Sequence, residues 1–157
     1  MSQLGELAEE LVSTEFAYLT GSEATVEENR ASGWFEANLG QLNTLLYSSF
    51  SGSDPDLRLE EDAIYKQMYL KNYWGSKAGA VLRGVDSTTM EWLRLREGDS
   101  SVERLNKNEV SKTYRGLASD AGAQIAELVA KYNAYQGSPR QVDSLVNAPC
   151  GQLESSI

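Results

Sequence analysis

The chain has 157 residues, 41% of them hydrophobic, a net charge of -9, no histidine and one cysteine, Cys150. This length suits one domain around one core, and a single cysteine excludes an intrachain disulfide and a thiolate metal cage. Without histidine the chain lacks the commonest general base and zinc ligand, so we expect no enzyme, no cofactor and no metal site.

The charge is distributed unevenly along the chain. Residues 1–62 hold 13 acidic and 2 basic residues, whereas residues 63–140 hold 12 basic and 8 acidic ones. This separation either lets copies associate, acidic part against basic part, or keeps the surface solvated. No segment approaches the ~18 consecutive apolar residues that cross a bilayer, and the N-terminus lacks a signal-peptide pattern. We therefore expect a product of the cytoplasm with no membrane partner.

Apolar residues at spacings of three and four predict an amphipathic helix over residues 2–19, which Gly21 stops. Thr25 and Glu28 have the spacing of a capping box and predict that a second helix begins there. We expect Ser32-Gly33 to interrupt that second element.

A further apolar stripe begins at Trp34 and predicts a helix of about four turns, with Asn43 as a polar contact beside it. We expect this helix to end near Ser51-Gly52. The loop that follows contains Asp54-Pro55-Asp56, a strong turn signal. The acidic residues of this region do not have the spacing of an EF-hand, so no calcium site is predicted.

The next predicted helix opens with Glu60, Glu61 and Asp62, which suit the positive end of the helix dipole. Its aromatic residues fall on more than one face of the helix: Tyr65, Tyr69, Tyr73 and Trp74. We favour a core position for these rings, and we name Tyr65 and Trp74 as the candidates for contact with a second surface.

The pattern changes near residues 90–100. Apolar and charged residues alternate there, which indicates a short extended segment or hairpin limb ahead of a break at Gly98. The same residues also fit a helix that begins at Ser87 or Thr88, and both interpretations stay open.

Asn106 followed by Glu109 predicts the start of the longest helix. Its apolar stripe has a 3.6-residue period over about six turns, and we expect this helix to be the spine of the core. The stripe consists of Val110, Tyr114, Leu117, Ala121, Ile125, Leu128 and Tyr132.

Residues 138–157 show no sustained period. We therefore divide the chain into a helical domain, residues 1–137, and a C-terminal tail or docking arm. The tail's candidates for gripping a partner are its apolar residues Val142, Leu145, Val146 and Leu153.

Basic residues cluster around the start of the longest helix, and we expect them to contact a partner. The cluster consists of Arg104, Lys107, Lys112 and Arg115. A pI near 4.5 argues against tight, sequence-independent DNA binding, in which neutralised phosphates dominate the affinity. A small DNA-associated regulator remains an alternative function.

Two runs of the sequence resemble a known family. LNTLLYSSFSGSDPDLRLEEDAIYKQMYLKNY (Leu42 to Tyr73) and LREGDSSVERLNKNEVSKTYRGLA (Leu95 to Ala118) look like neck proteins of tailed bacteriophages, in the head–tail connector or adaptor group. The resemblance covers roughly residues 34–135 and leaves the predicted helix at 2–19 outside it.

The resemblance implies a virion protein without an active site. Such adaptors form a ring, typically a dodecamer, between the portal and the tail; an arm docks onto the portal or a neighbour, and DNA passes through the centre without sequence-specific contact. The expected fold is a small all-α helical bundle with a long C-terminal helix and an extended C-terminal tail. It is nearly all-α if residues 90–100 form the short hairpin instead of a helix. A tail terminator or a minor head-completion protein is the alternative within the phage particle.

Overall fold

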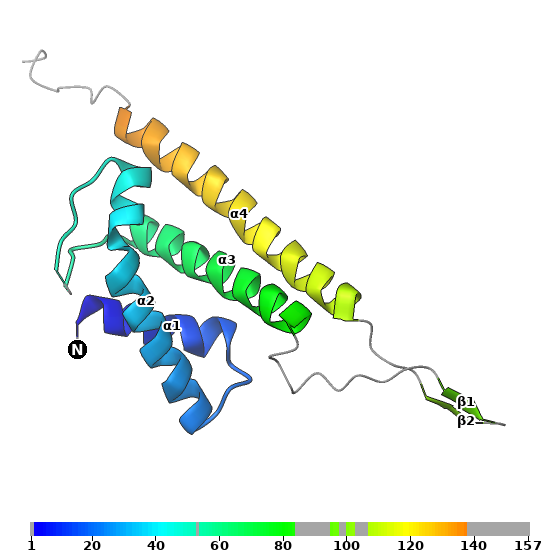
Figure 1. The fold of residues 1–157 in the computed structure, drawn as a ribbon. Helices are drawn as coiled ribbons and strands as arrows, with labels where there is room; N and C mark the ends of the chain where they lie inside the picture. The colour runs from blue at the N-terminus through cyan, green and yellow to red at the C-terminus, as the bar shows by residue number, and fades with distance from the viewer. Residues whose placement is uncertain (1, 53, 84–94, 98–99, 103–106, 138–157) are drawn as a thin grey trace, which may run out of the picture.

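The structure is a computed structural model that describes residues 2–52, 54–83, 95–97, 100–102 and 107–137 (Figure 1). This part of the chain forms an all-α bundle of four helices with one two-stranded hairpin. The helices are α1 (Gln3–Glu15), α2 (Ser22–Leu46), α3 (Leu59–Arg83) and α4 (Lys107–Gly137), and the strands are β1 (Leu95–Glu97) and β2 (Ser100–Val102). The predicted fold class is therefore confirmed.

Helices α3 and α4 run antiparallel and pack against each other along their length (Figure 1). Helices α1 and α2 pack together beside α3, and α4 also touches α2. Strands β1 and β2 are antiparallel, with Leu95 opposite Val102, and lie in the connection between α3 and α4. The strands overlap residues 90–100, the segment for which the sequence pattern left both a hairpin and a helix open.

Helix α1 forms because its apolar side chains face the core and its first turn is capped. Ser2 accepts a hydrogen bond from the Gly5 N–H at 3.3 Å. The helix ends at Glu15, four residues before the predicted end, because Phe16 leaves the helical conformation. Its ring is then completely buried, with its centroid 4.7 Å from that of Tyr73.

Helix α2 differs from the prediction at both predicted breaks. It begins at Ser22, before the expected capping box, and the Thr25 hydroxyl donates to the Gly21 carbonyl instead of capping an N–H group. It also continues through Ser32-Gly33, because Ala31 and Phe35 on either side are fully buried. Tertiary packing outweighs the modest helix-breaking tendency of one glycine.

The loop after α2 is fixed by two side-chain amides. Asn43 accepts from the Phe50 N–H and donates to the Phe50 carbonyl, both at 2.8 Å, so its predicted role as a polar contact is confirmed. Gln3 of α1 donates to the Leu57 carbonyl at 2.9 Å and accepts from the Leu57 N–H at 3.1 Å. Helix α2 itself ends at Leu46, earlier than predicted.

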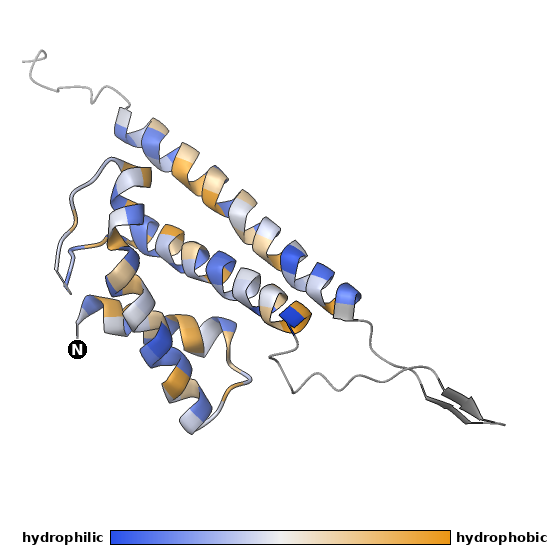
Figure 2. Ribbon diagram, viewed as in Figure 1, coloured by the Kyte–Doolittle hydropathy of each residue, from blue (hydrophilic) through white to orange (hydrophobic). Residues whose placement is uncertain are grey.

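The spine of the core is α3 and not α4. Nine residues of α3 are buried, including Ile64, Tyr65 and Tyr73. In α4, from residue 108 onward, only Ser111, Ala121 and Ile125 are buried. The predicted apolar stripe of α4 exists, and Figure 2 shows its apolar middle, but α3 covers only one side of the helix. The prediction that α4 forms the spine is therefore wrong.

Candidate interaction surface

The described residues show no candidate metal centre and no membrane-spanning helix. Within them, His, Cys, Asp and Glu form no group of three able to hold a metal ion. None of the helices described is long and apolar enough to cross a membrane. The candidate sites described below are the surfaces that the fold leaves uncovered.

The sequence-predicted interface residues separate into three groups. Lys112 and Arg115 are exposed on α4. Arg104 and the four tail residues Val142, Leu145, Val146 and Leu153 lie outside the described residues, and so does the side chain of Lys107. The remaining two candidates, both aromatic, lie on α3.

The prediction that Tyr65 contacts a second surface is wrong, because its side chain is completely buried. Its hydroxyl donates to the Phe35 carbonyl, and its ring lies 4.7 Å from that of Phe35 between centroids. Trp74 is half-buried and has an intrachain ring on each side. It stacks on Tyr114 of α4 at 5.7 Å and lies 6.3 Å from Phe16 of α1. The aromatic residues of α3 thus serve mainly to join α3 to its neighbours.

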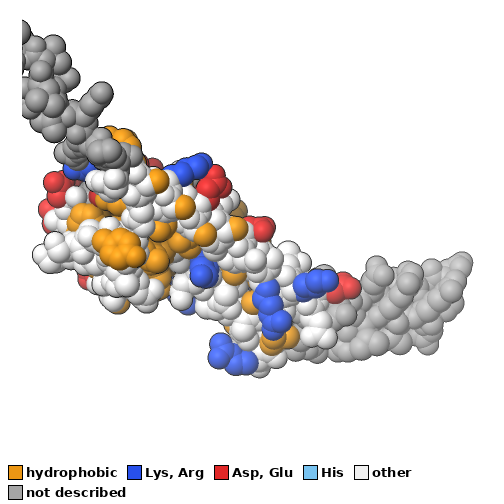
Figure 3. Space-filling model, turned by 90° about the horizontal axis from the view of Figure 1, so that it is seen from above, with side chains coloured by type: hydrophobic (Ala, Val, Ile, Leu, Met, Phe, Trp, Pro, Cys, Tyr) orange, Lys and Arg blue, Asp and Glu red, His pale blue; other side chains and the backbone are white. Residues whose placement is uncertain are grey.

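We define the stem as residues 71–83 of α3 and 108–118 of α4, the ends of these helices nearest the hairpin. The two segments are joined by the Trp74 and Tyr114 rings and by a 3.2 Å hydrogen bond from the Ser111 hydroxyl to the Ala78 carbonyl. Figure 3 shows blue side chains gathered over this part of the molecule with little red between them. The stem carries one acidic residue, Glu109, and five basic ones: Lys71, Lys77, Arg83, Lys112 and Arg115.

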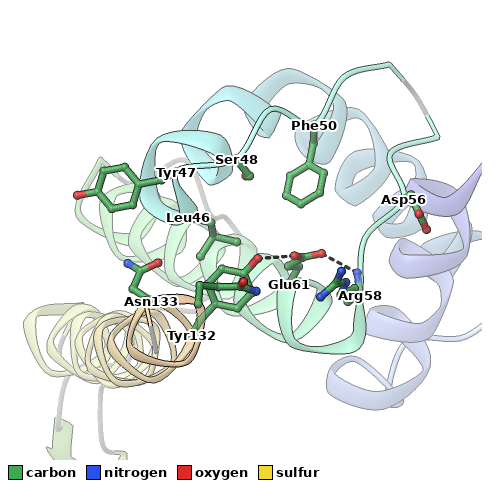
Figure 4. Close-up of a pocket in the computed structure, with 11 residues that line it drawn as sticks. Leu46, Tyr47, Ser48, Phe50, Asp56, Arg58, Glu61, Tyr132 and Asn133 are labelled. Atoms are coloured by element: carbon green, nitrogen blue, oxygen red, sulfur yellow. Dashed lines mark hydrogen bonds between the residues drawn. The ribbon is translucent and has the colours of Figure 1, made fainter. Parts of the chain in front are cut away.

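The opposite end of the α3–α4 pair, which we call the open end, has two adjoining hollows. The first, of about 620 Å³, lies between the loop after α2 and the last turns of α4 (Figure 4). At its floor the carboxylate of Glu61, only 3% exposed, accepts from the Tyr132 hydroxyl at 2.5 Å and from the Arg58 N–H at 2.7 Å. The Tyr132 bond ties the start of α3 to the end of α4, and the Arg58 bond closes the first turn of α3.

The second hollow, of about 550 Å³, shares Arg58, Tyr132 and Gln136 with the first. Large apolar side chains stand exposed on the rims of the two: Tyr47 is 89%, Leu59 85% and Tyr135 74% exposed. Tyr47 also has a positive φ of 53°, which is uncommon for a residue with a side chain. Exposed tyrosines beside hollows are typical of surfaces that bind another protein.

The sequence analysis did not identify Tyr47, Leu59 and Tyr135 as candidate surface residues. Tyr135 follows Tyr132 at helical spacing and Tyr47 follows the buried Leu46, so both read as continuations of a core pattern. No local signal shows where α2 ends and ceases to cover α4.

Comparisons of the chain with protein-family models, with curated proteins and with solved structures found no match. The assignment of a function therefore depends on the surfaces described above and on the resemblance seen in the sequence.

Proposed function

We propose that this protein is a structural subunit of a tailed-phage particle, a head–tail connector that assembles into a ring between the portal and the tail. In this role it has neither an active site nor a cofactor, and its partners are further copies of itself, the portal and tail or neck proteins. DNA passes through the ring, and the protein resides in the neck of the virion.

The observation that best supports assembly is the incomplete covering of α4. This helix has 31 residues, and within the described chain it packs only on α3 and on the end of α2. Leu117 remains 40% exposed and Tyr135 74% exposed. A long helix gains most of its stability from packing, so a side left uncovered in one copy favours covering by another.

The open end adds a second protein-binding feature at the opposite end from the basic stem. A subunit with two different adhesive ends forms heterologous contacts, which generate rings when the rotation between neighbours closes. The resemblance to phage adaptors supplies the identity of the particle, and the surfaces supply the reason for assembly.

The experiment is imaging by negative-stain electron microscopy of the purified full-length protein, alone and mixed with the portal ring of the same phage. A connector forms rings that stack coaxially on the portal. Rings that bind tail tubes and not the portal favour a tail terminator, and a monomer that binds duplex DNA favours the regulator. A monomer in both preparations contradicts the proposal.

A further inference from the structure

We propose that the stem of one copy binds helix α1 of a second copy, with Lys112 and Arg115 placed against Glu6 and Glu9. The inference rests on the proposed function only in that copies of the chain assemble. It names the two surfaces that meet and the chemistry by which they recognise each other.

The basic side of this contact is a surface whose charge the fold leaves unbalanced. Lys112 and Arg115 are exposed, lie three residues apart and therefore share one flank of α4. Neither forms an ion pair with another residue that the structure describes. Lys71 and Arg83, on the neighbouring part of α3, are also exposed and add to the positive field.

The acidic side is the outer face of α1. This helix contains no basic residue, and Glu6 and Glu9 are exposed on the side opposite the buried Leu4 and Leu7. Glu10 already bonds to Lys66 of α3 at 2.7 Å. In the described part of the chain, Glu6 and Glu9 form no such pair.

The two surfaces match in spacing as well as in sign. Each pair of charges stands at positions i and i+3 of a helix, so the charged groups on both helices are about 5–6 Å apart at their bases. Two such helices laid side by side bring both pairs of opposite charges together at once. The patches are different, so the contact is heterologous and each copy uses its stem and its α1 with two different neighbours.

A second copy fits the stem better than nucleic acid does. The whole chain carries a net charge of -9, so its electrostatic field repels a polyanion such as nucleic acid. The acidic residues are concentrated in residues 1–62, which gives a second copy an acidic surface for the stem. Electrostatic complementarity of this kind increases the rate of encounter and fixes the register of the partners. It also makes the association sensitive to salt, since the Debye length is about 10 Å at 0.1 M.

The test uses charge reversal in the full-length protein, with association measured by sedimentation velocity at low and high salt. The variants are E6K/E9K, K112E/R115E and the combination of all four substitutions. The control is E127K/K131E, which inverts the exposed 2.6 Å ion pair within α4 and preserves its attraction. Circular dichroism confirms that each variant retains its helices.

Each two-site reversal is expected to weaken association at least tenfold at low salt. The four-site variant is expected to recover association to within about threefold of the wild type, because like charges again meet opposite ones. The control is expected to match the wild type. Rescue by the four-site variant is the decisive result, since a structural defect in either surface would not be repaired by a second one.

Three outcomes overturn the inference. If the wild type assembles and both two-site variants assemble equally well, the stem and α1 do not meet, although the proposed function stands. If K112E/R115E leaves assembly intact and abolishes binding to duplex DNA, the stem's partner is nucleic acid. If the wild type stays monomeric, alone and with the portal, the proposed function falls together with this inference.

Discussion

The two buried glutamates among the described residues, Glu27 and Glu61, each accept a hydrogen bond from a tyrosine. Glu27 of α2, 7% exposed, accepts from the Tyr69 hydroxyl and lies 3.5 Å from the Arg30 guanidinium. Glu61 accepts from Tyr132 and from the Arg58 N–H. Burying a charge without partners is costly, so these bonds allow acidic residues to stand inside a small bundle. Burial also raises the pKa of Tyr69 and Tyr132, and the hydrogen bonds to Glu27 and Glu61 act in the same direction.

Removing the Tyr132 hydroxyl tests the hydrogen bond that joins the start of α3 to the end of α4 at the open end. We expect Tyr132→Phe to lower the free energy of unfolding by about 1–3 kcal/mol, because the buried Glu61 loses one of its two partners. Urea denaturation measures the change. Tyr135→Phe is the matched control, since Tyr135 is 74% exposed and should change stability by less than about 0.5 kcal/mol. Equal effects of the two substitutions would show that the Glu61 bond contributes nothing.

Asp62 makes stability depend on pH. One of its carboxylate oxygens is buried without a hydrogen-bond partner among the described residues. Burial is the main cause that raises its pKa above the ordinary 3.8; Lys66 opposes the shift, and Glu10 and Glu61 add to it. The folded protein therefore holds this proton more tightly than the unfolded chain does. Its contribution to stability is complete below pH 3.8 and declines as the pH rises through the raised pKa.

We accordingly expect Asp62→Asn to gain stability relative to the wild type as the pH rises from 3 to 7. Urea denaturation at several pH values measures the difference between the two proteins. The control is Asp56→Asn, which removes the charge of an exposed carboxylate instead. A constant difference between Asp62→Asn and the wild type across this range would refute the assignment.

Among the elements, helices were predicted well where apolar residues repeat, and poorly where packing decides. The acidic start of α3 and the break at its beginning follow from Glu60, Glu61, Asp62 and the turn at Pro55. The continuity of α2 through Gly33 could not be predicted from local signals, because it depends on the burial of Ala31 and Phe35 by partners distant in the sequence. Burying apolar side chains in this way contributes more free energy than local signals such as caps and glycines do.

Helix α4 shows why a period alone does not identify the centre of a core. A repeating stripe shows which side of a helix is apolar, but it does not show how many neighbours cover that side. Leu117 and Ile125 belong to the same predicted stripe, yet Leu117 is 40% exposed and Ile125 9% exposed. The exposed residues of the open end escaped prediction for the same reason.

Truncating Leu117 and Ile125 to alanine measures how much the burial of each side chain contributes to stability. Ile125→Ala should destabilise the monomer by about 2–5 kcal/mol, the range for large buried aliphatic residues. Leu117→Ala should cost less than about 1 kcal/mol, because water already reaches much of its side chain. Thermal melts at a concentration where the protein is monomeric provide the comparison. A larger loss for Leu117→Ala would mean that α4 is covered where the structure leaves it open.

At the scale of the whole molecule, the chain separates its surfaces by charge and polarity. Residues 1–62 carry 13 of its acidic residues, the stem is basic, and the open end presents large apolar side chains. The charge separation was readable from the sequence, since it follows from residue order. The sequence alone did not show which charged groups share a surface, because that depends on the antiparallel packing of α3 against α4.

The central claim is that copies of this chain assemble into a closed ring. Native mass spectrometry of the full-length protein over a range of concentrations, with and without the portal, tests it most directly. The account predicts one dominant species whose mass is a fixed multiple of the 17.3 kDa chain and does not grow with concentration. A 17.3 kDa monomer under every condition, or a series of masses that lengthens with concentration, would contradict it.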